Sequence, residues 1–243
     1  MPVSFPSFPA AWYFEQPETR RQELIQALQT EGAILLKNFP LESSHSQLEL
    51  FAQDLGNPLH EAHNLQGGML CLIEVDQSTP YPAYANTPFE FELHTDCADQ
   101  QTPPDTVVLQ CEQKSETGGE SYFLRLSTLL AHLSEDERSA LQKPDFHFRN
   151  QKFPILSSTT SGWQIRYNRL YQEIHRQSLS QEVGEQERLL NQLDQKMREL
   201  REVFQLQTGD CWILNNKQNL HGRAEFEAKS LRKLKRIRLN LHI

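Results

Sequence analysis

Apolar residues near the start of the chain recur at helical spacing in two segments, with one unbroken apolar run between them. The spacing predicts helices over residues 17–30 and 44–55, and Gly32 is a typical residue to end the first of them. The run over residues 33–36 is apolar at every position, which predicts a buried strand. The chain is therefore expected to begin with two helices and a strand buried between them.

Short strands dominate the rest of the chain. They are predicted at residues 69–75, 89–94, 106–111, 121–123, 203–207, 212–215 and 237–243. Two further helices are predicted at residues 127–142 and 181–203. Short strands with helices at the start and as insertions favour an α+β or mainly β fold, with a jelly-roll core (the double-stranded β-helix of cupin-like proteins) flanked by helices. No repeat or low-complexity linker divides the chain, so one domain over residues 1–243 is expected.

The composition is that of a globular protein and argues against some partners. Hydrophobic residues make up 37% and charged residues 23% of the 243 positions. The net charge of −8 disfavours nucleic acid, because binding a phosphate backbone needs a basic surface. No apolar run approaches the roughly eighteen residues of a membrane span, and the first residues lack the pattern of a secretory signal. The four cysteines form no CxxC pair, so reduced thiols and a cytoplasmic location are expected.

A His-Thr-Asp triplet at residues 94–96 is the first candidate for chemistry. Because alternate residues of a strand point to the same side, His94 and Asp96 can aim at one point. A second imidazole would complete the two-histidine, one-carboxylate set that suits Fe(II) and leaves coordination positions open. His221, in a polar loop after an apolar strand, is the candidate. Taken singly, the triplet also fits a surface turn, and a lone loop histidine is more often structural or solvated.

A basic segment near the end of the chain is the second candidate. In a strand, Arg232, Arg236 and Arg238 share one face, and apolar residues share the other. Arginines that point into a barrel need an anion, since a buried unpaired guanidinium is costly. A dicarboxylate would satisfy one through two parallel hydrogen bonds. The alternative is an exposed edge strand whose charges discourage aggregation, which would account for Lys233, Lys235 and also Arg238.

Together, these motifs resemble the taurine dioxygenase and clavaminate synthase-like superfamily of Fe(II)/2-oxoglutarate-dependent oxygenases. They occur in that family's order: His94-Thr95-Asp96, then His221-Gly222-Arg223 with Phe226, then Arg232-x-Leu234-x-Arg236. The strand at residues 32–39, the glycine pair before Ser121 and the Thr-Gly-Asp turn at residues 208–210 also match, so the resemblance runs from about residue 30 to the end. Asn-Asn-Lys at residues 215–217 departs from the Asp-Asn-Arg that is frequent in relatives.

The resemblance implies a complete set of cofactors and site residues. The iron ligands, which are also the catalytic residues, would be His94, Asp96 and His221. The co-substrate 2-oxoglutarate would bind Arg232 through its distal carboxylate, with Arg236 as a second contact and Ser121 in place of a threonine of relatives. With O2 as the other co-substrate, such an enzyme hydroxylates an unactivated C–H bond of a small polar metabolite, here an amino acid or a derivative of one, and releases succinate and CO2.

Two residues are candidates for contacts with that substrate. Arg166 lies in an Arg-Tyr-Asn segment that approaches the substrate pocket in relatives, and a solvent-facing arginine is the equal alternative. Asn86 would line the pocket, although the asparagine and the proline that follows it also favour a turn. The proline-rich segment over residues 77–88 is expected to act as a lid.

Two other functions fit parts of the pattern. A cupin-like iron enzyme that does not use 2-oxoglutarate would not require Arg232 and Arg236. A catalytically silent jelly-roll binding protein would not need to keep all three metal-binding residues, and a degenerate site should have lost at least one. The arginine pair therefore separates the first alternative from the oxygenase, and the intact ligand set separates the second.

Overall fold

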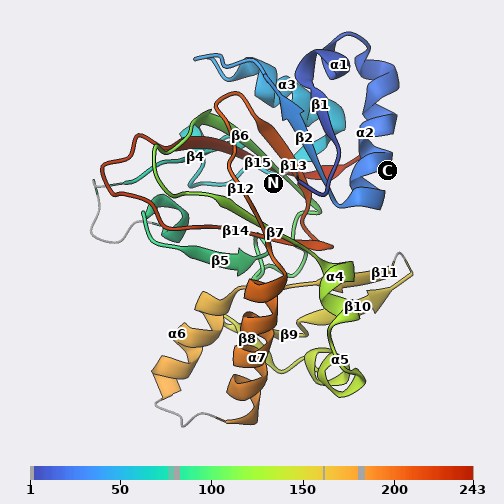
Figure 1. Cartoon of the computed structure of the whole chain (residues 1–243), viewed down its shortest axis with the longest axis vertical. Helices are drawn as coiled ribbons and strands as arrows, with labels where there is room; N and C mark the ends of the chain where they lie inside the picture. The colour runs from blue at the N-terminus through green and yellow to red at the C-terminus, as the bar shows by residue number, and fades with distance from the viewer. Residues whose placement is uncertain (1–2, 77, 79–82, 161, 180–183, 243) are drawn as a thin grey trace.

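Two β-sheets form the centre of the protein in the computed structural model, which describes residues 3–76, 78, 83–160, 162–179 and 184–242 (Figure 1). The larger sheet contains, in spatial order, β1 (Ser7–Pro9), β2 (Ala33–Lys37), β13 (Cys211–Asn215), β6 (Thr106–Gln113), β15 (Lys233–Leu241) and β3 (Gly56–Pro58), and β4 (Leu70–Ile73) also pairs with β15. The smaller sheet contains β12 (Glu202–Phe204), β7 (Ser121–Arg125), β14 (Asn219–Arg223) and β5 (Phe91–His94).

Strands β2 and β13 are buried on both faces, which explains their unbroken apolar runs. Leu35 and Trp212 face an inner core that they share with Phe123 of the smaller sheet. Their sequence neighbours Ile34 and Ile213 face an outer core on the opposite side. Because alternate residues of a strand point to opposite faces, one strand contributes to two cores. The two sheets thus face each other across the inner core.

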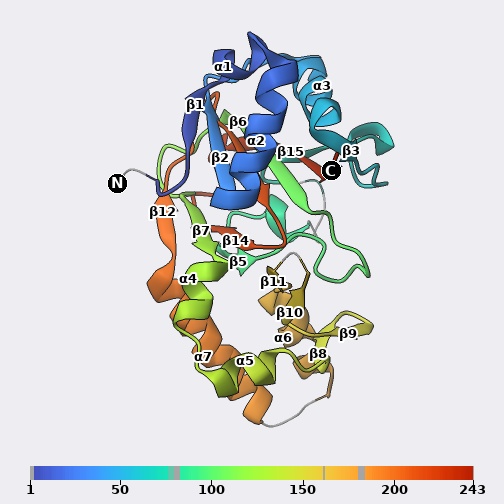
Figure 2. The same ribbon diagram turned by 90° about the vertical axis from the view of Figure 1, so that its right-hand side faces the viewer.

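The N-terminal helices cover the outer face of the larger sheet (Figure 2). They are α1 (Ala10–Phe14), α2 (Pro17–Glu31) and α3 (Ser46–Leu55). Leu24 and Leu28 of α2 and Phe51 of α3 pack on the strands beneath, so both helices predicted here are confirmed. Gly32 ends α2 with φ +77°, a left-handed conformation that glycine adopts without strain.

A helical region follows β7 and packs below the smaller sheet (Figure 1). Its elements are α4 (Leu126–Ala131), α5 (Glu135–Leu141), the hairpins β8 (Phe146–Phe148) with β9 (Gln151–Phe153) and β10 (Leu156–Thr159) with β11 (Gly162–Ile165), α6 (Arg169–Leu179) and α7 (Glu185–Leu200). Leu93, Leu124 and Leu220 of the sheet join its core. The smaller sheet is therefore covered on both faces.

The helix predictions in this region need correction. The prediction of a single helix over residues 127–142 is wrong. Helix α4 ends at Ala131, and a second helix, α5, begins with Ser134 as its N-cap. The Ser134 hydroxyl accepts from the Glu137 backbone N–H, and the Glu137 carboxylate accepts from the Ser134 backbone N–H. The last predicted helix ends at Leu200, and its first residues, 181–183, lie outside the described residues. Helices α1 and α6 and strands β1, β3, β8, β9, β10, β11 and β14 were not predicted. His221, which was expected in a loop, lies on β14.

The remaining strand predictions are found with small shifts at their ends. The strand predicted at residues 237–243 begins earlier, at Lys233, and that at residues 89–94 begins at Phe91. Two 3-10 turns, η1 (Leu65–Gly67) and η2 (Tyr84–Asn86), lie in the connections around β4. Across the described ranges, none of the helices combines the length and the apolar character that crossing a membrane requires.

Candidate active site

His94, Asp96 and His221 meet at one point, although His221 is far from the other two in sequence. His94 ends β5, and His221 lies directly opposite it on the neighbouring strand β14. The Nε2 atoms of both histidines lie 3.5 Å from Asp96 Oδ1. One ligand atom of each residue lies within 4.8 Å of the others, and all three residues are buried. Two imidazoles and one carboxylate in this arrangement suit Fe(II) and leave coordination positions open.

Neighbouring groups hold these side chains in place. His94 Nδ1 lies 2.8 Å from the Glu92 backbone oxygen, so with the proton on Nδ1 its Nε2 is available to a metal. Asn216 accepts from the Asp96 backbone N–H at 2.8 Å and donates to the Asp96 carbonyl oxygen at 3.0 Å. The Phe91 ring stacks on His94, with ring centroids 3.7 Å apart. Asn216 is the one residue of the run at 215–217 that agrees with the Asp-Asn-Arg frequent in relatives, and it supports a candidate ligand.

The protonation states of the cluster suit a metal ion. Burial, and then the charge of the neighbouring His221, lowers the pKa of His94 to about 4, so the His94 imidazole is neutral near pH 7. Burial by itself would raise the pKa of Asp96. The guanidinium groups of Arg238 and Arg236 outweigh it and hold that pKa well below its ordinary value. A neutral imidazole and an ionised carboxylate are the forms that bind a cation.

Strand β15 lies inside the larger sheet, with β6 on one side and β3 and β4 on the other. The edge-strand interpretation is therefore wrong for Lys235 and Arg238. Lys235 is 1% exposed, and its Nζ donates to the backbone oxygen of Glu42. The Arg238 Nε donates to Asp96 Oδ2 at 2.7 Å, and its Nη1 pairs with Glu61 at 2.8 Å. Arg238, whose side chain is 11% exposed, is thus a largely buried partner of a candidate metal ligand, a role that sequence reasoning missed.

Arg232 and Arg236 face the same small cavity as the histidines. Arg236 Nη1 lies 3.3 Å from Asp96 Oδ2. Arg232 is 6% exposed, and its side chain makes no hydrogen bond or ion pair with any described residue. Burial, and then the charge of Arg223, lowers the pKa of Arg232 to about 9, so it still carries its charge near pH 7. A Cβ on Gly119 would lie 3.2 Å from Arg232 Cδ, so glycine there leaves room for this side chain.

The cavity, of about 50 Å³, is rich in hydrogen-bond donors. Besides the three clustered residues, its polar lining includes Ser121, Trp212, Arg223, Arg232 and Arg236. Three buried donors there have no partner among the described residues: Trp212 Nε1, Arg223 Nη1 and Arg236 Nε. Buried donors without acceptors are costly, and guanidinium groups bind carboxylates well. The donor set therefore fits a dicarboxylate such as 2-oxoglutarate, next to the residues that would hold the iron.

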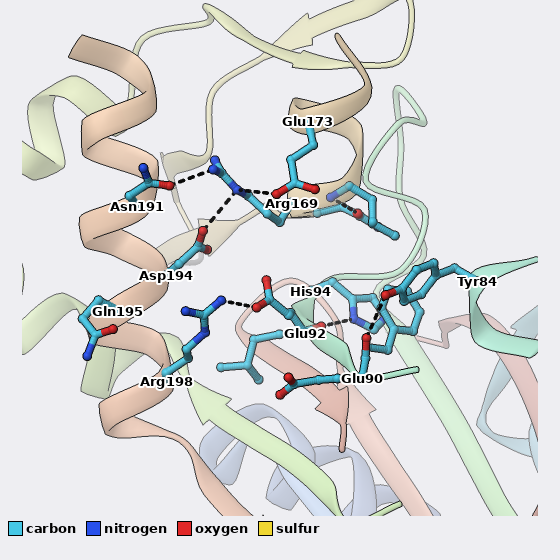
Figure 3. Close-up of a pocket in the computed structure, with 14 residues that line it drawn as sticks. Tyr84, Glu90, Glu92, His94, Arg169, Glu173, Asn191, Asp194, Gln195 and Arg198 are labelled. Carbon is cyan, nitrogen blue, oxygen red and sulfur yellow. Dashed lines mark hydrogen bonds and ion pairs between the residues drawn. The ribbon is translucent and has the colours of Figure 1, made fainter. Parts of the chain in front are cut away.

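A second cavity, of about 590 Å³, lies between β5 and helices α6 and α7 (Figure 3). His94 and Phe91 line both cavities, so the two adjoin at this pair of stacked rings. Charged side chains from the two helices and from β5 point toward one another across it (Figure 3). Arg198 pairs with Glu92, and Arg169 pairs with Asp194 at 3.2 Å.

The two predicted substrate contacts lie elsewhere. Arg166 donates to the backbone oxygens of Ala98, Gln100 and Gln101, and so holds the loop after Asp96. The Asn86 amide donates to the backbone oxygens of Leu72 and Glu74, and so holds η2 against β4. Neither residue lines the two cavities around His94. Of the predicted lid, residues 77 and 79–82 lie outside the described residues.

The residues beside Asn86 are closer to the site. Tyr84 lines the large cavity, and its hydroxyl donates to the Glu90 backbone oxygen at 2.9 Å. Ala85 lines the small cavity. Asn168, which follows Arg166 in the Arg-Tyr-Asn segment, lines the large one. The segments singled out from sequence therefore reach the site through different residues from those chosen.

Known proteins with solved structures share this fold. An asparagine oxygenase in complex with Fe(II), 2S,3S-3-hydroxyasparagine and succinate superposes with a TM-score of 0.78 over 94% of this chain and 81% of its own, at 19% sequence identity. The non-heme iron oxygenase OrfP, in complex with Fe, succinate and (3R,4R)-dihydroxy-L-Arg, gives a TM-score of 0.71 over 92% of this chain and 81% of its own, at 15% identity. At such identities the similarity shows the fold, a mixed α/β architecture built on β-sheets.

Sequence comparison adds the family. The 3-((Z)-2-isocyanoethenyl)-1H-indole synthase of Fischerella ambigua (strain UTEX 1903) is 26% identical over 244 aligned residues, which cover 90% of this chain and 85% of the synthase. The model of the family described as "Taurine catabolism dioxygenase TauD, TfdA family" matches residues 7–238. This match confirms the resemblance seen in the motifs. The chain belongs to the TauD, TfdA family and is a 2-oxoglutarate-dependent iron dioxygenase.

Proposed function

We propose that this dioxygenase hydroxylates a C–H bond of a small polar metabolite, an amino acid or a derivative of one, with iron held by His94, Asp96 and His221. The observation that carries the proposal is the pairing of this ligand cluster with a cavity of unpaired arginine donors. We interpret the two facing sheets as the double-stranded β-helix of cupin-like folds, since they enclose one core with the site at its margin.

Each protein group has a distinct part in this proposal. Iron with 2-oxoglutarate supplies the oxidising power for an unactivated C–H bond, with succinate and CO2 released. The chain supplies two imidazoles and an ionised carboxylate. The Glu92 backbone oxygen fixes the direction of His94, and Asn216 holds the backbone of Asp96. The buried walls exclude water from the reacting groups.

Arg232 would receive the distal carboxylate of 2-oxoglutarate, with Ser121 beside it and Arg236 nearer the metal. All three line the same cavity. Ser121 is buried, and its place at the start of β7 puts it directly opposite Arg223 of β14. A hydroxyl and a guanidinium together can satisfy one carboxylate.

The charges of the site support a substrate that carries a carboxylate. Four guanidinium groups, of Arg223, Arg232, Arg236 and Arg238, lie in or next to the small cavity, against the two carboxylates of Asp96 and Glu61. An Fe(II) ion and a 2-oxoglutarate dianion cancel each other's charge, so two positive charges stay uncompensated. Buried uncompensated charge is costly, and a substrate carboxylate would relieve it. The α-carboxylate of an amino acid meets this need.

The large cavity is our choice for the rest of the substrate. It reaches His94, and its volume suits a small metabolite. Its lining offers amide groups from Asn168, Asn191 and Gln195 as well as charged groups, so a polar side chain would find partners (Figure 3). The solved asparagine oxygenase and OrfP complexes contain hydroxylated asparagine and arginine, which agrees with an amino acid here.

Desaturation is a second candidate outcome. The curated relative is named for a product with an ethenyl group, which contains a carbon–carbon double bond. The same hydrogen removal can therefore end in an alkene instead of an alcohol. The protein groups described above would serve both outcomes.

A substrate screen tests the proposal. The iron-loaded protein is supplied with 2-oxoglutarate, O2 and individual amino acids and their derivatives, and succinate and products are measured by mass spectrometry. We expect succinate release to rise with a carboxylate-bearing compound, whose product gains one oxygen atom or loses two hydrogens. Matched amines without a carboxylate are the control. Stimulation by the amines alone would contradict the charge argument.

A further inference from the structure

Arg223 is a buried cation that the proposed roles leave unexplained. It follows His221 by two residues on β14 and is 5% exposed. A guanidinium group carries a positive charge near pH 7. No carboxylate of the described residues lies within ion-pair distance of it. A buried guanidinium without a counter-charge is costly, which points to a role that requires the charge.

The two terminal nitrogens of Arg223 have different surroundings. Nη2 donates to the backbone oxygens of Thr87 and Phe89, at 3.0 and 2.7 Å. Nη1 is buried and has no hydrogen-bond partner among the described residues, although the side chain lines the small cavity with Ser121 and Arg232. One end of the guanidinium is thus bound to backbone, while the other end lacks an acceptor beside a cavity that fits a carboxylate.

The backbone that Arg223 holds leads directly to the substrate side of the site. Residues 87–89 connect η2, which carries Tyr84 and Ala85, to β5, which carries His94. The Thr87 backbone N–H donates to the Tyr84 oxygen at 3.1 Å. Because Tyr84 lines the large cavity, a shift of residues 87–89 would move its wall.

Phe226 links the two unpaired arginines. Its ring lies 4.6 Å from the Arg223 guanidinium carbon and 5.4 Å from that of Arg232. Its backbone N–H donates to the Pro88 oxygen at 3.0 Å, in the middle of the segment that Arg223 holds. Stacking on an aromatic ring restrains a guanidinium in one orientation. Arg223, Arg232 and residues 87–89 therefore form one connected unit.

We propose that Arg223 is a positioning residue that couples occupancy of the co-substrate carboxylate site to the wall of the substrate cavity. Its Nη1 donates to the carboxylate that Arg232 receives, and its Nη2 then holds residues 87–89, and with them η2 and the start of β5, in one position. The proposal rests on the proposed function, because it needs a carboxylate in the small cavity. It adds a mechanical link between two ligand sites that meet at His94.

Hydrogen exchange of the backbone amides, followed by mass spectrometry under anaerobic conditions, tests this link. The iron-loaded protein is compared with and without 2-oxoglutarate, and peptides spanning residues 83–94 and Phe226 are monitored. We expect 2-oxoglutarate to slow exchange in these peptides in the wild type. In Arg223→Gln this protection should disappear, while 2-oxoglutarate still binds through Arg232 with about tenfold lower affinity, the loss of one charge-assisted hydrogen bond.

Two further variants make the result specific. Arg166→Gln is the matched control, because Arg166 also donates to backbone oxygens but does not line the small cavity. In this variant, 2-oxoglutarate should protect residues 83–94 from exchange as much as in the wild type. Arg223→Lys keeps the charge with a single nitrogen, so it should retain most of the affinity but not the protection. If Arg223→Gln does not fold, Arg223→Lys alone still tests whether Arg223 couples the two sites.

The outcomes are distinguishable. Protection of residues 83–94 in the wild type and equally in Arg223→Gln and Arg223→Lys would overturn the coupling. Absence of protection in the wild type, with 2-oxoglutarate visibly bound, would overturn it as well. Failure of the wild type to bind 2-oxoglutarate at all would instead refute the proposed co-substrate site, and would appear in the binding titration before any exchange is measured.

Discussion

The two cavities that meet at His94 differ in size, in charge and in the origin of their walls. The small cavity is lined largely by strands of the two sheets and holds arginines without counter-ions. The large cavity is walled by helices α6 and α7 together with β5, and its charged groups pair with each other (Figure 3). The first thus holds two guanidinium groups, of Arg223 and Arg232, that have no carboxylate partner among the described residues, whereas both arginines of the second are paired with carboxylates.

This difference indicates which part of the site is fixed and which part sets selectivity. Groups on paired strands inside a core can hardly move, so they suit a reaction that requires constant geometry. Arg169 and Asp194 of the large cavity are buried, but Asn191, Gln195 and Arg198 on α7 are exposed and can be exchanged with little loss of stability. We therefore expect variants of the small cavity to abolish activity, and variants of the large cavity to change the substrate.

The largest effect is expected for His221→Ala. Loss of one of three ligands should lower iron affinity and turnover at least about a hundredfold, since even residues that only support metal ligands commonly cost ten- to a hundredfold. Iron binding is measured by anaerobic titration and turnover by succinate release. His60→Ala, which changes an exposed histidine, is the control and should behave like the wild type. Equal iron affinity in both variants would remove His221 from the proposed ligand set.

Arg232→Met should separate binding from stability. Loss of a charge-assisted contact to a carboxylate should weaken 2-oxoglutarate binding about a hundredfold. The free energy of unfolding of the ligand-free protein should stay the same or rise by up to about 2 kcal/mol, because an unpaired buried charge has been replaced by an apolar side chain. Urea denaturation measures the second quantity. Lys233→Met, at the half-exposed neighbour, should change neither. Unchanged 2-oxoglutarate affinity with a clear loss of stability would make Arg232 structural.

Asp194 in the large cavity should make stability depend on pH. Burial raises its pKa from 3.8 to about 6, against the hydrogen bond from Tyr167 and the charge of Arg169. A raised pKa in the folded state contributes stability that is fully present below pH 3.8 and is lost as the pH rises through about 6. The loss, on the order of 3 kcal/mol, should be missing in Asp194→Asn.

Urea denaturation of the metal-free proteins at about pH 5 and about pH 7.5 measures this difference. The stability of Asp194→Asn relative to the wild type should rise between the two values. A relative stability that falls or stays constant would show that the Asp194 carboxylate does not titrate in this range.

The smallest effect on stability is expected for Arg198→Gln. The Arg198 side chain is 50% exposed and pairs with Glu92 across the large cavity, so the free energy of unfolding should change by less than about 1 kcal/mol. The KM for the substrate should nevertheless change severalfold, while 2-oxoglutarate affinity stays constant. Steady-state kinetics against each ligand separately measures this. A change in 2-oxoglutarate affinity would contradict the assignment of Arg198 to substrate binding alone.

Much of the small cavity could be predicted from sequence, because its residues lie in short motifs on strands. The alternation from Arg232 to Arg236 follows from the period of a strand, which is local information. The His-Thr-Asp triplet is also a local motif, but strand alternation does not explain its geometry, because β5 ends at His94 and Asp96 lies in the turn that follows. The family resemblance linked these motifs to each other and to His221. What could not be predicted from sequence was which strands lie beside β15. Whether Arg238 lies at an edge or inside a sheet depends on β3, β4 and β6, which come from distant parts of the chain.

The large cavity could not be predicted in the same way. Its walls come from β5 and from two helices more than seventy residues away, of which α6 was not recognised. The hairpins between α5 and α6 are short, and their apolar residues follow no clear period, so the pattern gave no reason to place Asn168 or Asp194 near His94. Arg223 was visible as part of the His-Gly-Arg motif, but only the fold shows that its Nη1 lacks a partner within the part of the chain that the structure describes.

An anaerobic titration of the metal-free protein with Fe(II), followed by 2-oxoglutarate, tests the central claim most directly. When 2-oxoglutarate chelates iron in such a site, a weak visible charge-transfer band is expected. We predict that the band appears in the wild type, is absent in His221→Ala, and in Arg232→Met requires about a hundredfold more 2-oxoglutarate. Iron binding without any band in the wild type would contradict the account, because the unpaired arginines of the small cavity would then serve another ligand.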